Sequence, residues 1–136
     1  MWDYGKAIEI AQNELVDYNK KLRVLRDYYL TNIEKSIPFI RVNGDLENRL
    51  CGNANVCFKG VDGGEMLQEL DKVGICASSG SACSAGLLNP SHVLLAIGVP
   101  ASIARSSLRV TFGKENTIED VDYLVGNLVK IVQKLR

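Results

Sequence analysis

The sequence predicts an α+β domain with a small mixed or mostly antiparallel sheet covered by helices, and with a long N-terminal helix. A long segment without proline repeats apolar residues at helical spacing, several short segments have the composition of strands, and amphipathic patterns separate and follow them. The expected order is helix, strand, strand, helix, strand, helix, strand, helix. Because this order mixes hairpin-like links with crossovers, we expect helices to cover one face of the sheet.

The first expected element is a helix over residues 1–36, followed by an α+β body over residues 37–136. Pro38 limits the helix, because the residue before a proline is pushed away from the helical region. Its apolar residues recur in steps of three and four: Ile8, Ala11, Leu15, Tyr18, Leu22, Leu25, Tyr29 and Ile33. We do not expect one small sheet to cover this whole stripe, and we expect its uncovered part to join two copies of the chain as a homodimer. The alternative is a helix that folds back fully on its own domain and leaves a monomer.

Strands are expected at residues 39–42, 53–58, 75–77 and 107–112. Apolar residues alternate with small or polar ones over residues 53–58 and 107–112, and Asn43-Gly44 and Lys59-Gly60 end the first two segments. We expect the strand over residues 75–77 to be short and buried.

Three further helices are expected in the body. Asp62 precedes a helix whose apolar face is Met66, Leu67 and Leu70, and Gly74 ends it. A second helix runs over residues 92–97 and stops at Gly98. The last helix begins after Thr117, which forms a capping-box pattern with Asp120.

The length and composition fit one globular domain. The chain has 136 residues, of which 46% are hydrophobic and 24% are charged, close to the average soluble domain. Lys and Arg number 16, as do Asp and Glu, so the formal net charge is zero. This balance argues against nucleic acid or an anionic membrane as the main partner, and zero net charge favours self-association.

The sequence carries no signal for export or membrane insertion. No apolar run approaches the roughly 20 residues that cross a membrane, and the first residues lack the basic-then-apolar order of a signal peptide. Four cysteines are too few for a disulfide scaffold and are expected to be thiols. We therefore expect a cytoplasmic protein.

The segment over residues 78–86 is the strongest candidate for chemistry. All nine of its side chains are small, and Cys83 lies among serines and glycines. Such a segment cannot pack a core, and Gly80 and Gly86 can act as hinges. Two interpretations remain open: a flexible linker in which the cysteine is incidental, and a thiolate that travels to its reaction partner.

Several sequence blocks, in order and at matching spacing, resemble the C-terminal part of the NifS-like cysteine desulfurases. These are pyridoxal-phosphate enzymes of the class V aminotransferase group. The blocks are residues 78–86 (Ser-Ser-Gly-Ser-Ala-Cys-Ser-Ala-Gly), 89–94 and 107–113, with residues 41–44, 53–56 and 60–63 upstream. The resemblance spans essentially the whole chain. It implies the C-terminal small domain of a fold-type I pyridoxal-phosphate enzyme, in which residues 1–36 form the connecting helix.

The resemblance implies a role for two residues. Cys83 matches the catalytic cysteine, whose thiolate takes sulfur from L-cysteine to give L-alanine and a Cys83 persulfide. Arg109 matches the arginine that binds the substrate carboxylate, and a guanidinium suits that two-pronged contact. Without the resemblance, Arg109 would be read as an ordinary strand arginine paired with an acidic neighbour. The mobile loop of the long-loop subgroup corresponds to Ser79, Gly80, Ser81, Ala82, Ser84 and Gly86.

The other histidine and cysteine positions are weaker candidates. His92, the single histidine, is expected to have a capping or packing role, with a minor role in proton transfer as the alternative. Cys57 and Cys76 are expected to be small core residues, and Cys51 to be partly exposed in a turn. None of these cysteines forms the close pairs of a zinc site, so no metal is expected.

The cofactor of the family is expected outside this chain. The family holds pyridoxal phosphate with a ring-stacking histidine and a Schiff-base lysine that follows another histidine, and this sequence has no His-Lys pair. We therefore expect a fragment that binds no cofactor and is inactive alone. The partners that the resemblance implies are L-cysteine and a sulfur-acceptor scaffold protein of iron-sulfur cluster or thio-cofactor assembly. A stand-alone persulfide carrier or interaction module without cofactor is the alternative, and a metal-binding thiol protein is a weaker one.

Overall fold

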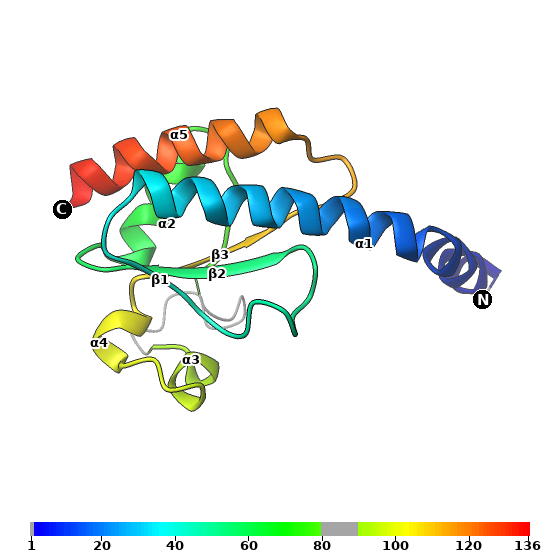
Figure 1. The fold of residues 1–136 in the computed structure, drawn as a ribbon, viewed down its shortest axis with the longest axis horizontal. Coiled ribbons are helices and arrows are strands. Elements are labelled where there is room, and N and C mark those ends of the chain that lie inside the picture. The colour runs from blue at the N-terminus through cyan, green and yellow to red at the C-terminus, as the bar shows by residue number, and fades with distance from the viewer. Residues whose placement is uncertain (1, 80–89) are drawn as a thin grey trace.

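A three-stranded antiparallel sheet forms the centre of the domain in the computed structural model, which describes residues 2–79 and 90–136 (Figure 1). The strands are β1 (Ile40–Val42), β2 (Asn53–Phe58) and β3 (Ser107–Thr111), in the spatial order β1-β2-β3. The helices are α1 (Trp2–Ser36), α2 (Gly63–Lys72), α3 (His92–Ala96), α4 (Ala101–Ala104) and α5 (Ile118–Leu135). The α+β class and the long N-terminal helix are confirmed.

The register of the sheet separates an apolar face from a polar one. Val56 on β2 lies opposite Val42 on β1 and Leu108 on β3. One residue away, Asn55 lies opposite Arg109. Because side chains alternate across a strand, the valines and Leu108 face the core while Asn55 and Arg109 face the other side.

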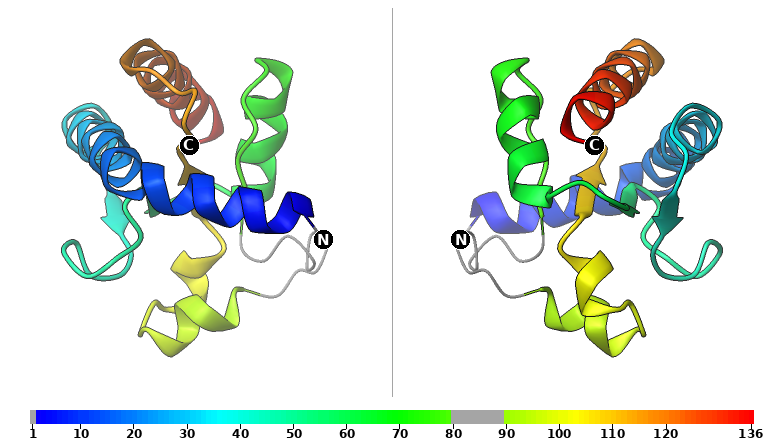
Figure 2. Two further views of the ribbon diagram at one scale, coloured as in Figure 1. Left: turned by 90° about the vertical axis from the view of Figure 1, so that its right-hand side faces the viewer. Right: turned by 90° about the vertical axis from the view of Figure 1, so that its left-hand side faces the viewer.

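Helices α1, α2 and α5 cover the apolar face of the sheet (Figures 1 and 2). The half of α1 nearer the sheet buries Leu22, Leu25, Tyr29 and Ile33 in this core. The Tyr29 ring meets the Phe112 ring edge-on, with centroids 5.8 Å apart. The remaining core side chains come mainly from α2, α5 and the strands: Met66, Leu70, Ala54, Val56, Phe58, Leu108, Val110, Val121, Leu124, Leu128, Ile131 and Val132.

The predicted helix starts are confirmed. The Asp62 carboxylate accepts hydrogen bonds from the backbone of Gly64 at 2.8 Å and Glu65 at 3.1 Å, which satisfies two free donors of α2. Thr117 and Asp120 form a reciprocal capping box at the start of α5.

The expected strand over residues 75–77 is wrong. Ile75 and Ala77 are half-buried against the core, but the backbone of this segment does not pair with a strand until Ser78, which forms a single bridge with Arg109. Cys76 therefore points away from the core and is exposed, contrary to the expectation of a core residue. Within the described residues, this segment finds a pairing partner on β3 at Ser78 alone.

Helices are not confined to one face, which corrects a second expectation. The short helices α3 and α4 lie on the opposite side of the sheet from the other three (Figure 2). Leu94, Val99 and Ala104 pack there on Cys57, whose side chain is fully buried. The four-residue α4 was not predicted, because so short an element has too few residues to show a periodic pattern.

The N-terminal half of α1 extends beyond the sheet and α5 (Figure 1). Ile8 is 50% exposed and Leu15 is 51% exposed, although both belong to the same apolar stripe as the buried Leu22. The expectation that the sheet does not cover the whole stripe is confirmed. No helix within the described residues is long and apolar enough to span a membrane.

Candidate functional site

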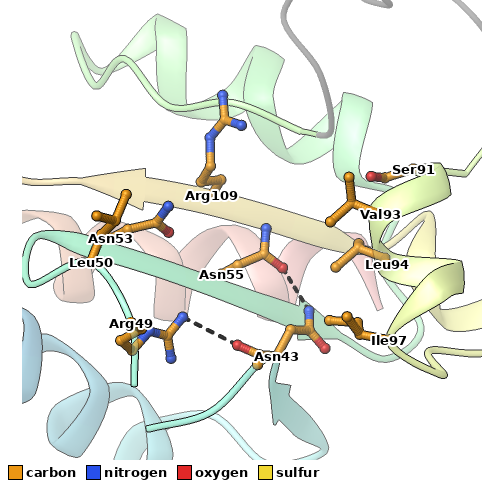
Figure 3. A pocket seen from close by; sticks show the side chains of 11 residues that line it. Asn43, Arg49, Leu50, Asn53, Asn55, Ser91, Val93, Leu94, Ile97 and Arg109 are labelled. Carbon is orange, nitrogen blue, oxygen red and sulfur yellow. Dashed lines mark hydrogen bonds between the residues drawn. The ribbon is translucent and has the colours of Figure 1, made fainter. Parts of the chain in front are cut away.

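A pocket of about 260 Å³ opens on the polar face of the sheet, between β2, β3, α3 and the loop that follows β1 (Figure 3). Its lining combines two arginines and three asparagines with an apolar wall, and includes no Asp or Glu. The lining residues are Asn43, Gly44, Arg49, Leu50, Asn53, Asn55, Ser91, Val93, Leu94, Ile97 and Arg109. A basic and amide-rich floor without carboxylates suits an anionic ligand.

Arg109 reaches this pocket because of its place on β3. Leu108 and Val110 on either side are buried in the core, so the alternation of the strand turns Arg109 to the pocket face. Its side chain is half-buried. The described residues include every Asp and Glu of the chain, and none of them forms a salt bridge with Arg109. The ion pair of an ordinary strand arginine is therefore not formed.

The root of the cysteine-bearing segment is fixed to Arg109 through the backbone. The Ser78 N–H donates to the Arg109 carbonyl at 3.1 Å, and the Arg109 N–H donates to the Ser78 carbonyl at 2.6 Å. On the other side of the segment, Ser91 lines the same pocket. One flank of residues 80–89 is thus paired with Arg109, and the other lines the same pocket.

Of the predicted loop residues, only Ser79 is described, and it is half-buried. Cys83, together with Gly80, Ser81, Ala82, Ser84 and Gly86, lies outside the described residues. Their assignment remains a prediction.

A buried amide, Asn43, organises the floor of the pocket. Asn43 is 3% exposed, and its Nδ2 donates to Asn55 Oδ1 at 2.6 Å and to Cys57 Sγ at 3.1 Å. Arg49 Nη2 donates to the Asn43 carbonyl at 3.2 Å (Figure 3). The sequence analysis did not single out Asn43, Asn55 or Arg49. The sequence signal that could have indicated them is the alternation of Asn53 and Asn55 with apolar residues, which puts both asparagines on one face of a strand.

A tight turn brings Arg49 to Asn43. The Asp45 carboxylate accepts backbone hydrogen bonds from Asn48 at 2.6 Å and Glu47 at 2.8 Å. These bonds, the one from Asn48 most of all, lower the pKa of Asp45 below its usual value. Burial, followed by the charge of Arg26, lowers the pKa of Arg49.

The remaining candidate residues do not line this pocket. His92 is exposed at the first residue of α3. Cys51 is half-buried and donates to Asn19 Oδ1 at 2.9 Å, as expected for a partly exposed turn cysteine, and Cys57 is buried as expected. Within residues 2–79 and 90–136, no three His, Cys, Asp or Glu residues form a group that could hold a metal ion.

The pocket lining does not fit pyridoxal phosphate. Enzymes that use this cofactor attach it to a lysine through a Schiff base. The lining contains no lysine. No chemical step at a cofactor can therefore be assigned to this pocket.

The chain is similar to known proteins over nearly its whole length. The family model described as aminotransferase class-V matches residues 3–124. A protein named cysteine desulfurase IscS from Clostridium botulinum is 45% identical over 134 residues, which cover 97% of this chain and 34% of that relative. The chain thus spans about a third of the length of this relative.

Solved structures show the same fold. A NifS-like protein superposes with a TM-score of 0.82 at 28% identity, covering 96% of this chain and 32% of that one. A NifS-like protein from Rickettsia africae superposes with a TM-score of 0.83 at 23% identity, covering 96% and 33%. Because the family model matches residues 3–124, which are most of this chain, the chain belongs to the class-V aminotransferase family.

Proposed function

We propose that residues 1–136 form the C-terminal small domain of a cysteine desulfurase, with residues 1–36 as the connecting helix and 37–136 as the body. Relatives of that name are 45% identical over 97% of this chain. They are about three times as long, since the chain covers 34% of them. The rest of such a protein would hold pyridoxal phosphate.

The reaction moves one sulfur atom. L-Cysteine and the Cys83 thiol give L-alanine and a Cys83 persulfide, with the thiol proton retained in the products. Pyridoxal phosphate, when bound in the longer protein, supplies the electron sink for chemistry at the amino acid. Arg109 binds the substrate carboxylate, and Cys83 accepts the sulfur.

The observation that supports this proposal most is the backbone pairing of Ser78 with Arg109 beside a pocket without carboxylates. Cys83 follows Ser78 by five positions in the sequence. Five residues of extended chain reach at most about 18 Å. This reach supports the proposed attack of Cys83 on a substrate whose carboxylate is bound by Arg109.

The proposal includes partners and surroundings. The persulfide sulfur passes to an acceptor scaffold protein for iron-sulfur cluster or thio-cofactor assembly. The protein acts in the cytoplasm as a homodimer, and His92 has at most a minor role. The absence of an acidic partner for Arg109 supports its availability for a substrate carboxylate.

The test uses the longer protein with Cys83→Ser, and Cys76→Ser as the matched control. Cys76 is exposed and lies on the other side of Ser78 from Cys83. Incubated with L-cysteine, the Cys83→Ser protein is expected to keep its cofactor absorbance but to form neither persulfide nor alanine. The control should form both. Undiminished alanine formation by Cys83→Ser would overturn the proposal, and alanine formation by the 136-residue chain alone would overturn the domain assignment.

A further inference from the structure

A second hydrogen-bond donor lies beside Arg109 in the pocket. Asn55 and Arg109 occupy directly opposed positions on β2 and β3, and both line the pocket. Side chains at directly opposed positions of antiparallel strands start with their Cβ atoms about 4.5–5.5 Å apart. The two residues can therefore contact one small ligand together.

The orientation of the Asn55 amide is set by Asn43. The two amide hydrogens of Asn43 Nδ2 have two acceptors, Asn55 Oδ1 at 2.6 Å and Cys57 Sγ at 3.1 Å. Because Asn55 uses its oxygen for this bond, its nitrogen is turned away from Asn43. Figure 3 shows that nitrogen on the side of the strand that carries Arg109.

Asn43 is itself held firmly. Its backbone N–H donates to the Asn55 carbonyl at 2.9 Å, and its carbonyl accepts from Arg49 at 3.2 Å. Its side chain is 3% exposed, beside the fully buried Cys57. The buried Asn43 Oδ1 has no hydrogen-bond partner among the described residues, so the two Nδ2 contacts, to Asn55 and Cys57, are what orient the two amides.

The free donors match one class of ligand. Among the described residues, neither Asn55 Nδ2 nor the Arg109 guanidinium donates to a side chain or backbone acceptor. A carboxylate is an acceptor with two oxygens. The apolar side chains of Val93, Leu94 and Ile97 complete the lining. This combination suits a small carboxylic acid with a short aliphatic part.

We infer that Asn55 is a second carboxylate-binding residue: its Nδ2 donates to one carboxylate oxygen while Arg109 binds the other. Asn43 is a positioning residue that acts through Asn55. The inference rests on the proposed function, in which the carboxylate belongs to L-cysteine. It adds a residue that would select for a carboxylate at that position.

The test follows propionate binding to the ¹⁵N-labelled chain by NMR, using the side-chain signals of Asn55 Nδ2 and Arg109 Nε. Both signals are expected to shift saturably with propionate and not with sodium chloride at equal ionic strength. Asn55→Asp keeps the oxygen that Asn43 needs but replaces the donor with a negative oxygen. It should weaken propionate binding at least about tenfold, as expected for a lost charge-assisted hydrogen bond.

Two further variants separate binding from structure. Asn13→Asp puts the same charge at an exposed position of α1 that does not line the pocket, and should change affinity less than about threefold. Asn43→Ala should weaken binding, and adding Asn55→Ala should weaken it little further, because residues that act as a unit are not additive.

The outcomes distinguish this inference from the proposed function. Equal losses in Asn55→Asp and Asn13→Asp, or a shift of the Arg109 signal without one of Asn55, would overturn the role of Asn55 and leave the desulfurase proposal intact. A propionate titration that shifts neither signal would overturn the carboxylate site on this domain. The desulfurase proposal fails separately, through alanine formation by Cys83→Ser.

Discussion

The N–H of Gly63 donates to the carbonyl of Arg105 at 3.0 Å, at a point where α2 begins directly against the chain that enters β3. A Cβ atom on Gly63 would lie 2.7 Å from the Arg105 oxygen and 2.9 Å from the Ser79 hydroxyl. The start of α2 therefore lies against both the chain that enters β3 and Ser79, at the root of the segment that carries Cys83.

Gly63→Ala is expected to destabilise the domain by about 1–3 kcal/mol, because the added methyl group must displace backbone atoms. The matched control is Gly126→Ala on α5, where a Cβ would meet no atom within 4 Å. That change should stabilise the domain by about 0.5–1 kcal/mol, since alanine is the better helix former. Urea unfolding of both variants measures the difference, and equal stabilities would contradict the close approach at Gly63.

Arg109→Lys in the longer protein should chiefly raise the cysteine concentration needed for half-maximal activity. A lysine cannot make the two-pronged contact of a guanidinium, and the loss corresponds to about a ten- to hundredfold increase. Arg105→Lys is the control, because Arg105 is exposed and does not line the pocket. If both variants need the same cysteine concentration for half-maximal activity as the wild type, Arg109 does not bind the carboxylate.

Tyr29→Phe should leave stability unchanged or raise it by about 1 kcal/mol. The Tyr29 hydroxyl is buried and has no hydrogen-bond partner among the described residues, and an unpaired buried hydroxyl is unfavourable. Phenylalanine keeps the edge-on contact with Phe112, whereas Tyr29→Leu loses it and should destabilise the domain. Thermal unfolding of the three proteins is the measurement, and a marked loss in Tyr29→Phe would reveal a partner for the hydroxyl.

Glu69 should make the folding stability of the domain decrease at low pH. It receives hydrogen bonds from Lys134 of α5 at 2.7 Å and from Lys72 at 2.6 Å. These bonds, the one from Lys134 first, lower the pKa of Glu69 from 4.5 to about 2. A carboxyl group with a lowered folded-state pKa stabilises the fold above its unfolded pKa, and this stabilisation disappears as the pH falls toward 2.

The melting temperature of Glu69→Gln should therefore lie below that of the wild type at pH 7, and the two should converge near pH 2. Glu47→Gln removes the same charge from an exposed loop residue whose carboxylate has no salt-bridge partner among the described residues. It should follow the wild type at every pH. A constant difference between Glu69→Gln and the wild type would show that the two lysines do not perturb the carboxyl group.

The parts of the fold with a strong local pattern were predictable from the sequence. The stripe of α1, the alternation of β2 and the capping residues Asp62 and Thr117 each appear within a few neighbouring residues. The segment containing Cys76 was mispredicted because its pairing depends on which residues of β3 are free, and that is decided by the sheet. The four residues of α4 are stabilised by packing over Cys57, which no local pattern reveals.

Only part of the candidate site was predictable, because some of its residues matter through tertiary contacts that no local pattern reveals. The resemblance pointed to Cys83 and Arg109, but it did not single out Asn43 or Asn55. These asparagines gain their significance from the register that sets Asn55 opposite Arg109, and from the burial of Asn43 beside Cys57. Both are tertiary relationships between segments more than ten residues apart.

Helix α1 provides the last prediction, because half of one apolar stripe is buried and the other half is exposed. Ile8 and Leu15 are about half exposed on the part of α1 that extends beyond the sheet, while Leu22 is in the core. The zero net charge of the chain provides no long-range repulsion between copies. We expect the 136-residue chain to associate through this half of α1.

The test is light scattering at micromolar concentration on the wild type and on the double variant Ile8→Lys, Leu15→Lys. The wild type is expected to have the mass of a dimer and the double variant that of a monomer, because two lysines would have to be buried in the contact. Val24→Lys is the matched control: it lies on the same helix and is 58% exposed, beside the buried Leu25. That variant should remain a dimer. A monomeric wild type, or a double variant that still associates, would show that the exposed half of α1 does not drive self-association.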